Sequence, residues 1–360
     1  MSTDDSGKIS GKISGKIKIL FCLIVISLAF VMFLFMELLA RAIVDTSPSP
    51  MAAVEALFVP SQNFQLIYEL NPQNPEVNSF GMRQPDFDRS MLHDQFVIAV
   101  IGDSHTYSVK SPDRDNAFPA RLEQHLKALT GKPIKVLNFG VPGYDMHQEL
   151  AVLKTKALAF EPDLVILQYC INDEHISNYI QPQYIWLNRA IHRSVLLSRG
   201  WMEFLYSPSG KKYLLPFVGK HVPDLLLVAP GLVGTQMAYG ERDPAHSLHP
   251  PRSPQEVPPR YHDFIGRENF ERDVKLFGQV AKGAGIPTIA TGFIAEQHRD
   301  LYETSGFQVY SFFEIFQGLD MRDYGYDPAV TWEHFSDSGS DVIGHALAGF
   351  IEANVDLSKN

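Results

Sequence analysis

The stretch FVIAVIGDSH (residues 96–105) decides the fold class. Its first six residues, 96–101, form an unbroken apolar run that ends in Gly102. A run of this kind is typical of a strand that is buried on both faces, as in a parallel sheet. The polar residues 103–105 would then follow the carboxyl end of the strand, which is where open α/β sheets place their sites.

Strand-like and helix-like segments alternate on the carboxyl side of this stretch. Such alternation implies right-handed crossovers and a parallel sheet with helices on both faces. We therefore expect a three-layer αβα sandwich. The predicted strands are 96–101, 134–138, 164–170 and 287–293, and the predicted helices are 119–129, 148–160, 268–284 and 341–353.

On the amino side, residues 19–36 contain no charged side chain. With its flank to residue 39 this segment is about 20 residues long, enough to cross a hydrocarbon core of ~30 Å as a helix. Lysines precede it at positions 8, 12, 16 and 18, whereas Arg41 is the one nearby basic residue after it. The excess predicts a single-pass protein of the inner (cell) membrane, with a cytoplasmic N-terminus and an extracytoplasmic, periplasmic domain. A cleaved signal peptide is the alternative, but its apolar region is normally only ~7–15 residues long.

The chain divides by composition into a membrane part and a large domain. Residues 1–18 carry a threefold Ser-Gly-Lys-Ile repeat and are expected to form a disordered cytoplasmic tail. Residues 19–39 are the predicted transmembrane helix, and 40–92 a linker or entry segment. The domain itself spans 93–355, with an insertion at about 177–265 that is too long for a structureless loop. The insertion is interpreted either as a lid or substrate-binding subdomain, or as a structural addition at the membrane surface.

Charge and cysteine content exclude some classes of protein. The formal net charge is −10, and no basic patch is evident in the sequence, which argues against a nucleic-acid partner. The chain has two cysteines, Cys22 and Cys170. Because Cys22 lies in the apolar segment, a disulfide between them is not expected.

Metal-dependent chemistry is also disfavoured. Asp103-Ser104-His105 has the Asp-x-His form that opens the pattern of binuclear metallophosphoesterases. That pattern also needs Gly-Asp-x-x-Asp and Gly-Asn-His segments for its two metal sites, and neither occurs here. The zinc peptidase pattern His-Glu-x-x-His is absent as well. We therefore expect no metal site and no cofactor.

The ends of the predicted strands carry residues suited to acyl transfer. Ser104 follows the first strand, Gly143 lies just beyond the second, Asn172 follows the third, and His334 precedes the last helix. A serine hydroxyl becomes a good nucleophile when a neighbouring histidine accepts its proton. The backbone N–H groups of Ser104 and Gly143 and the amide of Asn172 could stabilise the tetrahedral oxyanion. Gly143 has no Cβ, so its backbone can approach a ligand closely.

These four segments resemble the four sequence blocks of the SGNH, or GDSL-type, hydrolase family. Residues 102–105 match the nucleophile block, and Gly339, five residues after His334, also fits the histidine block. The segments 78–83 and 138–149 resemble a membrane-anchored bacterial branch of the same family. The resemblance implies a flavodoxin-like parallel sheet and a serine ester hydrolase or acyltransferase.

Two positions depart from the family pattern. Cys170 stands where the asparagine block usually begins with glycine. Thr331 stands three residues before His334, where the catalytic aspartate is usual, so Asp327 is the predicted acid of the triad. Glu333, directly beside His334, would normally point elsewhere. The predicted catalytic residues are thus Ser104, His334 and Asp327, and the predicted oxyanion hole consists of Ser104, Gly143 and Asn172.

Together, the resemblance and the membrane segment lead us to expect an extracytoplasmic serine acyl-esterase or O-acyltransferase. Its expected substrate is an acylated cell-envelope carbohydrate, and envelope polysaccharide machinery is a candidate partner. Two alternatives stay open. One is an ester hydrolase of the lipase or lysophospholipase type, because the insertion is apolar and near the membrane. The other is a non-catalytic assembly or binding factor, an alternative suggested by the departures from the family pattern at Cys170 and Thr331.

Overall fold

A computed structural model describes residues 15–43, 57–176, 179–180, 194–196, 209, 233–234, 259–329 and 333–358. Five of its strands form one parallel sheet in the order β4-β3-β5-β8-β9. Counted along the chain this is the order 2-1-3-4-5 of flavodoxin-like sheets, as predicted. The order reverses between β3 and β5, so a site is expected beyond the carboxyl ends of these two strands. The strands are β3 (Phe96–Gly102), β4 (Ile134–Gly140), β5 (Leu164–Tyr169), β8 (Thr288–Gly292) and β9 (Gln308–Val309).

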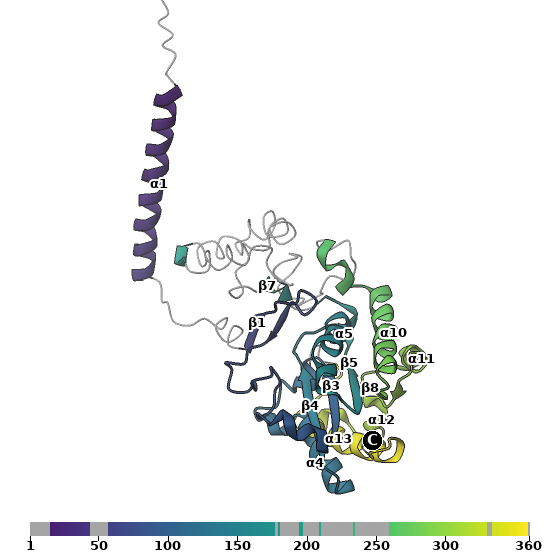
Figure 1. Ribbon diagram of the computed structural model, residues 1–360. Coiled ribbons are helices and arrows are strands. Elements are labelled where there is room, and N and C mark those ends of the chain that lie inside the picture. The colour runs from purple at the N-terminus through teal and green to yellow at the C-terminus, as the bar shows by residue number, and fades with distance from the viewer. Residues whose placement is uncertain are drawn as a thin grey trace, which may run out of the picture.

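Helices cover both faces of the sheet and complete the predicted three layers (Figure 1). Successive residues of β3 enter two separate cores, because side chains alternate along a strand. Val97, Ala99 and Ile101 pack in the core with α5 and α10, whereas Ile98 and Val100 pack in the core with α4 and α13. All five are buried. The four covering helices are α4 (Phe118–Thr130), α5 (Met146–Thr155), α10 (Arg267–Gly283) and α13 (Asp337–Asn354).

Shorter elements connect these layers. Most are single turns whose first residue is capped by a side-chain oxygen, as at Asp88 before η1 and Ser311 before α12. The helical ones are η1 (Arg89–Asp94), α3 (Ser104–Tyr107), η2 (Arg114–Asn116), η3 (Ala157–Phe160), η4 (Ile171–Glu174), η9 (Pro259–Phe264), α11 (Glu296–Thr304), α12 (Phe312–Ile315) and η10 (Met321–Tyr324). The strands β6 (Tyr179–Ile180) and β7 (Val233–Gly234) form a separate antiparallel pair.

Residues 57–92 differ from the linker expected over 40–92. The strands β1 (Phe58–Pro60) and β2 (Tyr68–Leu70) pair antiparallel, and the side chains around them are part of the core beneath α5. Ile67 and Met82 are completely buried. The segment has no regular apolar period because it packs through turns, and so its sequence resembles a linker.

Most of the insertion expected at 177–265 lies outside the described residues. Its final part does not: Tyr261 and Phe264, on η9, are buried in the same core as α5 and α10. The domain therefore resumes by residue 259.

The N-terminal helix α1 (Gly15–Ile43) is long and apolar enough to cross a membrane over Lys16–Ile43. A cleaved signal sequence can have the same composition, so length and composition alone do not distinguish a membrane anchor from a signal sequence. Near the end of α1, the carboxylate of Glu37 accepts hydrogen bonds from Ser194 Oγ (2.8 Å), Val195 N (2.9 Å) and Leu196 N (3.0 Å). Glu37 is 8% exposed. The end of α1 is thus bound to a segment of the expected insertion.

Candidate active site

Ser104 is placed by a sharp turn from β3 into α3. A Cβ at Gly102 would lie 2.3 Å from Thr106 Oγ1, so the strand can meet this turn only with glycine at its end. The carboxylate of Asp103 accepts a hydrogen bond from His105 N at 2.9 Å and caps α3. The capped turn leaves Ser104 half-buried at the carboxyl edge of the sheet.

His334 meets Ser104 from the other end of the chain. The distance from His334 Nε2 to Ser104 Oγ is 2.8 Å, within hydrogen-bond range. The segment that carries His334 is held by Ser336 N, which donates to Tyr324 O at 2.9 Å. It is also held by Lys110, which pairs with Glu333 and donates to Gly325 O at 2.7 Å. A nucleophile and a base in hydrogen-bond contact are the starting arrangement for acyl transfer.

His105 forms one wall of this pair. Its ring centroid lies 4.6 Å from that of His334 at an interplanar angle of 32°, and 5.3 Å from that of Phe293. Burial lowers the pKa of His105 to about 3. His105 is therefore a neutral aromatic packing residue at physiological pH, in a position where the family commonly has Leu or Phe.

The side chains of Asp103 and Asn172 link the segments that follow β3, β4 and β5. Asp103 Oδ2 lies 3.2 Å from Ser104 Oγ, and Asn172 Nδ2 donates to Tyr144 O at 2.8 Å. Burial raises the pKa of Asp103, whereas hydrogen bonds from His105, Ser104 and Asn172 and the nearby His334 favour its charged form. Asn172 thus contacts both the turn of Ser104 and the loop of Gly143.

The Gly143 loop is held by two tyrosines. Gly143 has φ +81°, a conformation that favours glycine. Tyr68 Oη donates to Pro142 O at 2.8 Å, and Tyr144 Oη donates to Tyr68 O. The two rings meet edge to face at 5.1 Å. Among the described residues, no hydrogen bond engages the backbone N–H of Ser104 or of Gly143, so both are available to an oxyanion.

Asp327, the predicted acid, has a different described contact. Its Oδ1 accepts a hydrogen bond from Ala329 N at 3.0 Å, and no hydrogen bond described in 259–329 or 333–358 joins it to His334. Thr331 lies outside the described residues. The assignment of the acid therefore stays a prediction, while the contact between Ser104 and His334 is present. Sequence patterns did not identify Tyr68, whose one signal is an aromatic residue in an irregular segment.

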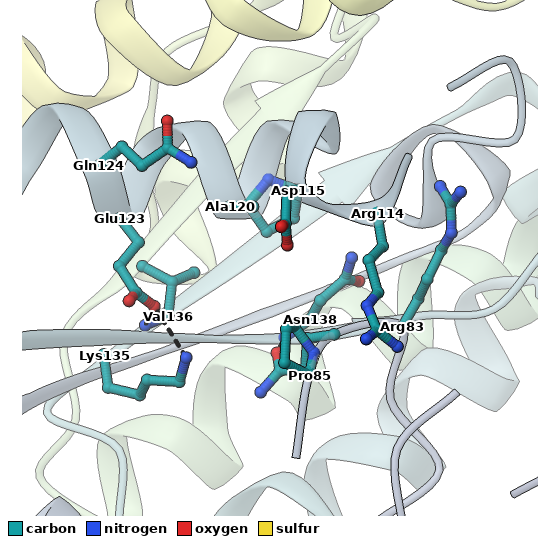
Figure 2. A pocket seen from close by; sticks show the side chains of 12 residues that line it. Arg83, Pro85, Arg114, Asp115, Ala120, Glu123, Gln124, Lys135, Val136 and Asn138 are labelled. Carbon is teal, nitrogen blue, oxygen red and sulfur yellow. Dashed lines mark hydrogen bonds and ion pairs between the residues drawn. The ribbon is translucent and has the colours of Figure 1, made fainter. Parts of the chain in front are cut away.

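Figure 2 shows a cavity of about 150 Å³ that lies away from this centre. Its walls come from the start of α4, from the middle of the edge strand β4 and from residues 83–85. Lys135 and Glu123 form an ion pair across it at 3.1 Å. None of its lining residues contacts Ser104 or His334 in the described hydrogen bonds, so we do not assign it to the reaction. In the part of the chain that the structure describes, no group of three or more His, Cys, Asp or Glu is arranged to hold a metal ion.

A flavodoxin-like sheet with a Ser–His pair at the reversal of its strand order defines the class of α/β serine hydrolases. More specifically, the chain belongs to the GDSL-like lipase/acylhydrolase family, whose model matches residues 100–342. This match confirms the family that the four sequence blocks indicated. No curated protein matches the chain.

Solved structures with distant similarity include three esterase-type proteins. A putative lipolytic protein of the G-D-S-L family from Desulfitobacterium hafniense DCB-2 is 13% identical, with a TM-score of 0.35 over 71% of this chain and 99% of that one. A catalytic mutant of Axe2, an acetylxylan esterase from Geobacillus stearothermophilus, is 14% identical, with a TM-score of 0.38 over 73% and 96%. A two-domain esterase (CEX) active on acetylated mannans is 11% identical, with a TM-score of 0.39 over 75% of this chain and 53% of that one. The family assignment rests on the family match and not on these likenesses.

Proposed function

We propose that this chain is an extracytoplasmic serine acyl-esterase or O-acyltransferase that acts on acylated cell-envelope carbohydrate. The observation that carries the proposal is the 2.8 Å contact between Ser104 Oγ and His334 Nε2, next to two backbone N–H groups without described acceptors. This contact also favours catalysis over the role of a non-catalytic assembly factor, since such a role would not require it.

In the proposed reaction, Ser104 Oγ attacks the acyl carbonyl carbon while His334 Nε2 accepts the hydroxyl proton. The N–H groups of Ser104 and Gly143 donate to the oxyanion. The amide of Asn172 is the third predicted donor; its Nδ2 donates to Tyr144 O and bonds with Asp103, so it has to turn from one of them to reach the oxyanion. Collapse of the tetrahedral species expels the sugar alkoxide, which takes the proton back from His334 and leaves an acyl-serine. Water then releases the acid, or an acceptor hydroxyl takes the acyl group, with His334 again accepting the proton.

Asp327 is retained as the proposed acid that orients His334. Asp103 is a second carboxylate beside the histidine, but its hydrogen bonds to His105 N and Ser104 Oγ assign it to the turn. Substitution of each acid in turn would separate the two roles.

The proposed location follows from α1 and from the lysines before it. With a cytoplasmic N-terminus, everything beyond α1 lies outside the membrane. Envelope glycans are then the acylated substrates available to the domain. A lipid ester is the second candidate, because Glu37 holds residues 194–196 of the insertion at the end of α1. Cleavage of long-chain and not short-chain p-nitrophenyl esters would favour the lipid.

The test of the proposal is labelling of the full-length chain with a fluorophosphonate, which reacts with activated serines. We expect labelling of the wild type, none of Ser104→Ala, and strongly reduced labelling of His334→Ala. Turnover of p-nitrophenyl acetate should vary in parallel. No labelling of the wild type, or equal labelling of Ser104→Ala, would falsify the proposal. Mass analysis of an acetylated oligosaccharide after incubation, with and without an acceptor sugar, then distinguishes hydrolysis from transfer.

A further inference from the structure

Four carboxyl groups are buried on or next to the segments that carry the proposed oxyanion hole. Asp103 follows β3, Asp173 lies on η4 after β5, Asp145 caps α5, and Glu149 lies one turn further along α5. Their exposed fractions are 3% or less, and Glu149 is fully buried. Each of the three segments that carry a proposed oxyanion donor therefore also carries a buried carboxyl group.

The hydrogen-bond partners of these acids are unequal. Asp103 and Asp145 accept bonds at the starts of their helices, from His105 N at 2.9 Å and from Gln148 N at 3.0 Å. Asp173 Oδ2 accepts from Cys170 N at 3.1 Å, but its Oδ1 has no donor among the described residues. Within the same part of the chain, neither oxygen of Glu149 has a donor. In the sequence these acids cannot be distinguished from exposed acidic residues, because a sequence does not show burial.

One further polar group belongs to this region. The hydroxyl of Tyr302, on α11, is completely buried and has no hydrogen-bond partner in the described part of the chain. Asp173 and Glu149 both act electrostatically on Tyr302, so the three side chains share one environment. Unpaired atoms from an acid on α5, an acid on η4 and a phenol on α11 therefore gather in one buried region.

The electrostatics of this region disfavour four negative charges. Burial raises the pKa of Glu149 well above its usual value, and Asp173, Asp103 and Asp145 raise it further. Burial likewise raises the pKa of Asp173, with Asp103 adding to the effect. A buried carboxylate with no donor and no cation is far less stable than the neutral acid.

We propose that Glu149 carries a proton in the folded protein and, as a neutral acid within this cluster, positions the segments of Asn172 and Gly143. The proton gives Glu149 an O–H with which to donate inside the cluster, in addition to the hydroxyl of Tyr302. Glu149 is a positioning residue, since it acts through Asp173 and α5 and does not touch the substrate. The effect on turnover rests on the proposed function, whereas the protonation itself does not.

Loss of this proton at high pH should disturb the site. The titratable groups that act on Glu149 are Asp145 at the start of α5, Asp103 after β3 and Asp173 on η4, and Tyr302 on α11 shares their surroundings. An ionised Glu149 would therefore repel Asp173 and Asp103 and oppose an oxyanion nearby.

The kinetic test compares Glu149→Gln, Glu149→Leu and the exposed control Glu352→Gln. Gln keeps a donor and cannot ionise, so we expect a kcat within about threefold of the wild type near neutral pH and no fall of kcat at alkaline pH. Leu supplies no donor, so we expect a kcat at least tenfold lower with little change in KM. The control should follow the wild type. An alkaline fall that persists in Glu149→Gln, or equal losses in Gln and Leu variants, would overturn the positioning role.

The protonation has its own test, independent of turnover. In the infrared spectrum of the full-length chain near neutral pH, we expect a carbonyl band of a protonated carboxyl that is missing in Glu149→Gln. The same comparison in the Ser104→Ala background should give the same difference. If the wild type has no esterase activity but the band is lost in Glu149→Gln, the proposed function fails and the protonated cluster stands. A band unchanged in Glu149→Gln, or lost instead in Asp173→Asn alone, would overturn the assignment to Glu149.

Discussion

Tyr68 holds the Gly143 loop through its hydrogen bond to Pro142 O, and we call this contact the clamp. The effect of removing it can be predicted from the described contacts. Tyr68→Phe removes the hydrogen bond from the hydroxyl to Pro142 O, which is 2.8 Å long. It keeps the edge-to-face contact with Tyr144, whose ring centroid is 5.1 Å away. The side chain is completely buried, so its loss is that of a buried hydrogen bond without a large cavity. We expect the free energy of unfolding to fall by about 1–2 kcal/mol.

The same substitution should also slow the reaction. Pro142 O belongs to the peptide group whose N–H is that of Gly143, the proposed oxyanion donor. Loss of one such donor costs ~10²–10³ in kcat, which is the upper limit here because the loop keeps its other contacts. We expect a loss of about tenfold, or ~1.4 kcal/mol of transition-state stabilisation.

The assays are urea unfolding followed by fluorescence, and kcat and KM for p-nitrophenyl acetate. Tyr310→Phe is the control, since Tyr310 stacks on Phe350 and makes no described contact with the Gly143 loop. It should leave kcat unchanged. If Tyr68→Phe lowers stability as expected but leaves kcat at the wild-type value, the clamp stabilises the fold and does not position the donor, and the reasoning is refuted.

Three further predictions concern the histidine, the acid and the buried cluster. His105→Phe should keep kcat within about threefold of the wild type above pH 5, because His105 is neutral there and serves as a ring against His334; a loss of 100-fold would show that it takes part in proton transfer. Asp327→Asn should lower kcat at least tenfold with little change in KM, and an unchanged kcat would remove Asp327 from the proposed triad. Because the pKa of Glu149 is raised in the folded protein, its contribution to stability is complete below the unfolded-state pKa of about 4.5. This contribution is lost as the pH rises from there toward the folded-state pKa, by up to ~1.4 kcal/mol per pH unit. Chemical denaturation across pH 5–8 should therefore show a shallower decline for Glu149→Gln than for the wild type, and identical slopes would contradict this linkage.

The sequence predicts the sheet well because the decisive signal is local. β3 is buried on both faces, so its apolar residues are consecutive and end where the polar site residues begin. β9 is only two residues long and lies at the edge of the sheet, which leaves no such run to detect. The segment that carries Tyr68 was interpreted as a linker because its burial depends on contacts with Pro142 and Tyr144, more than 70 positions away.

The site shows the same division between local and distant information. Ser104 and His334 could be paired from the sequence because their blocks have a recognisable form. The buried state of Glu149 could not be predicted in this way, since it arises from the way α5 packs against β3 and η4. The acid of the triad depends on a segment around Thr331 that the described residues do not include.

The hydrogen bonds at Glu37 also determine what a shortened chain would measure. A polypeptide that begins after Ile43 retains Ser194, Val195 and Leu196 but lacks the carboxylate that accepts their hydroxyl and two N–H groups. A fragment that lacks α1 is thus altered at residues 194–196 as well as at its N-terminal end. Kinetic measurements on such a fragment should be repeated on the full-length protein before its substrate preference is attributed to the intact chain.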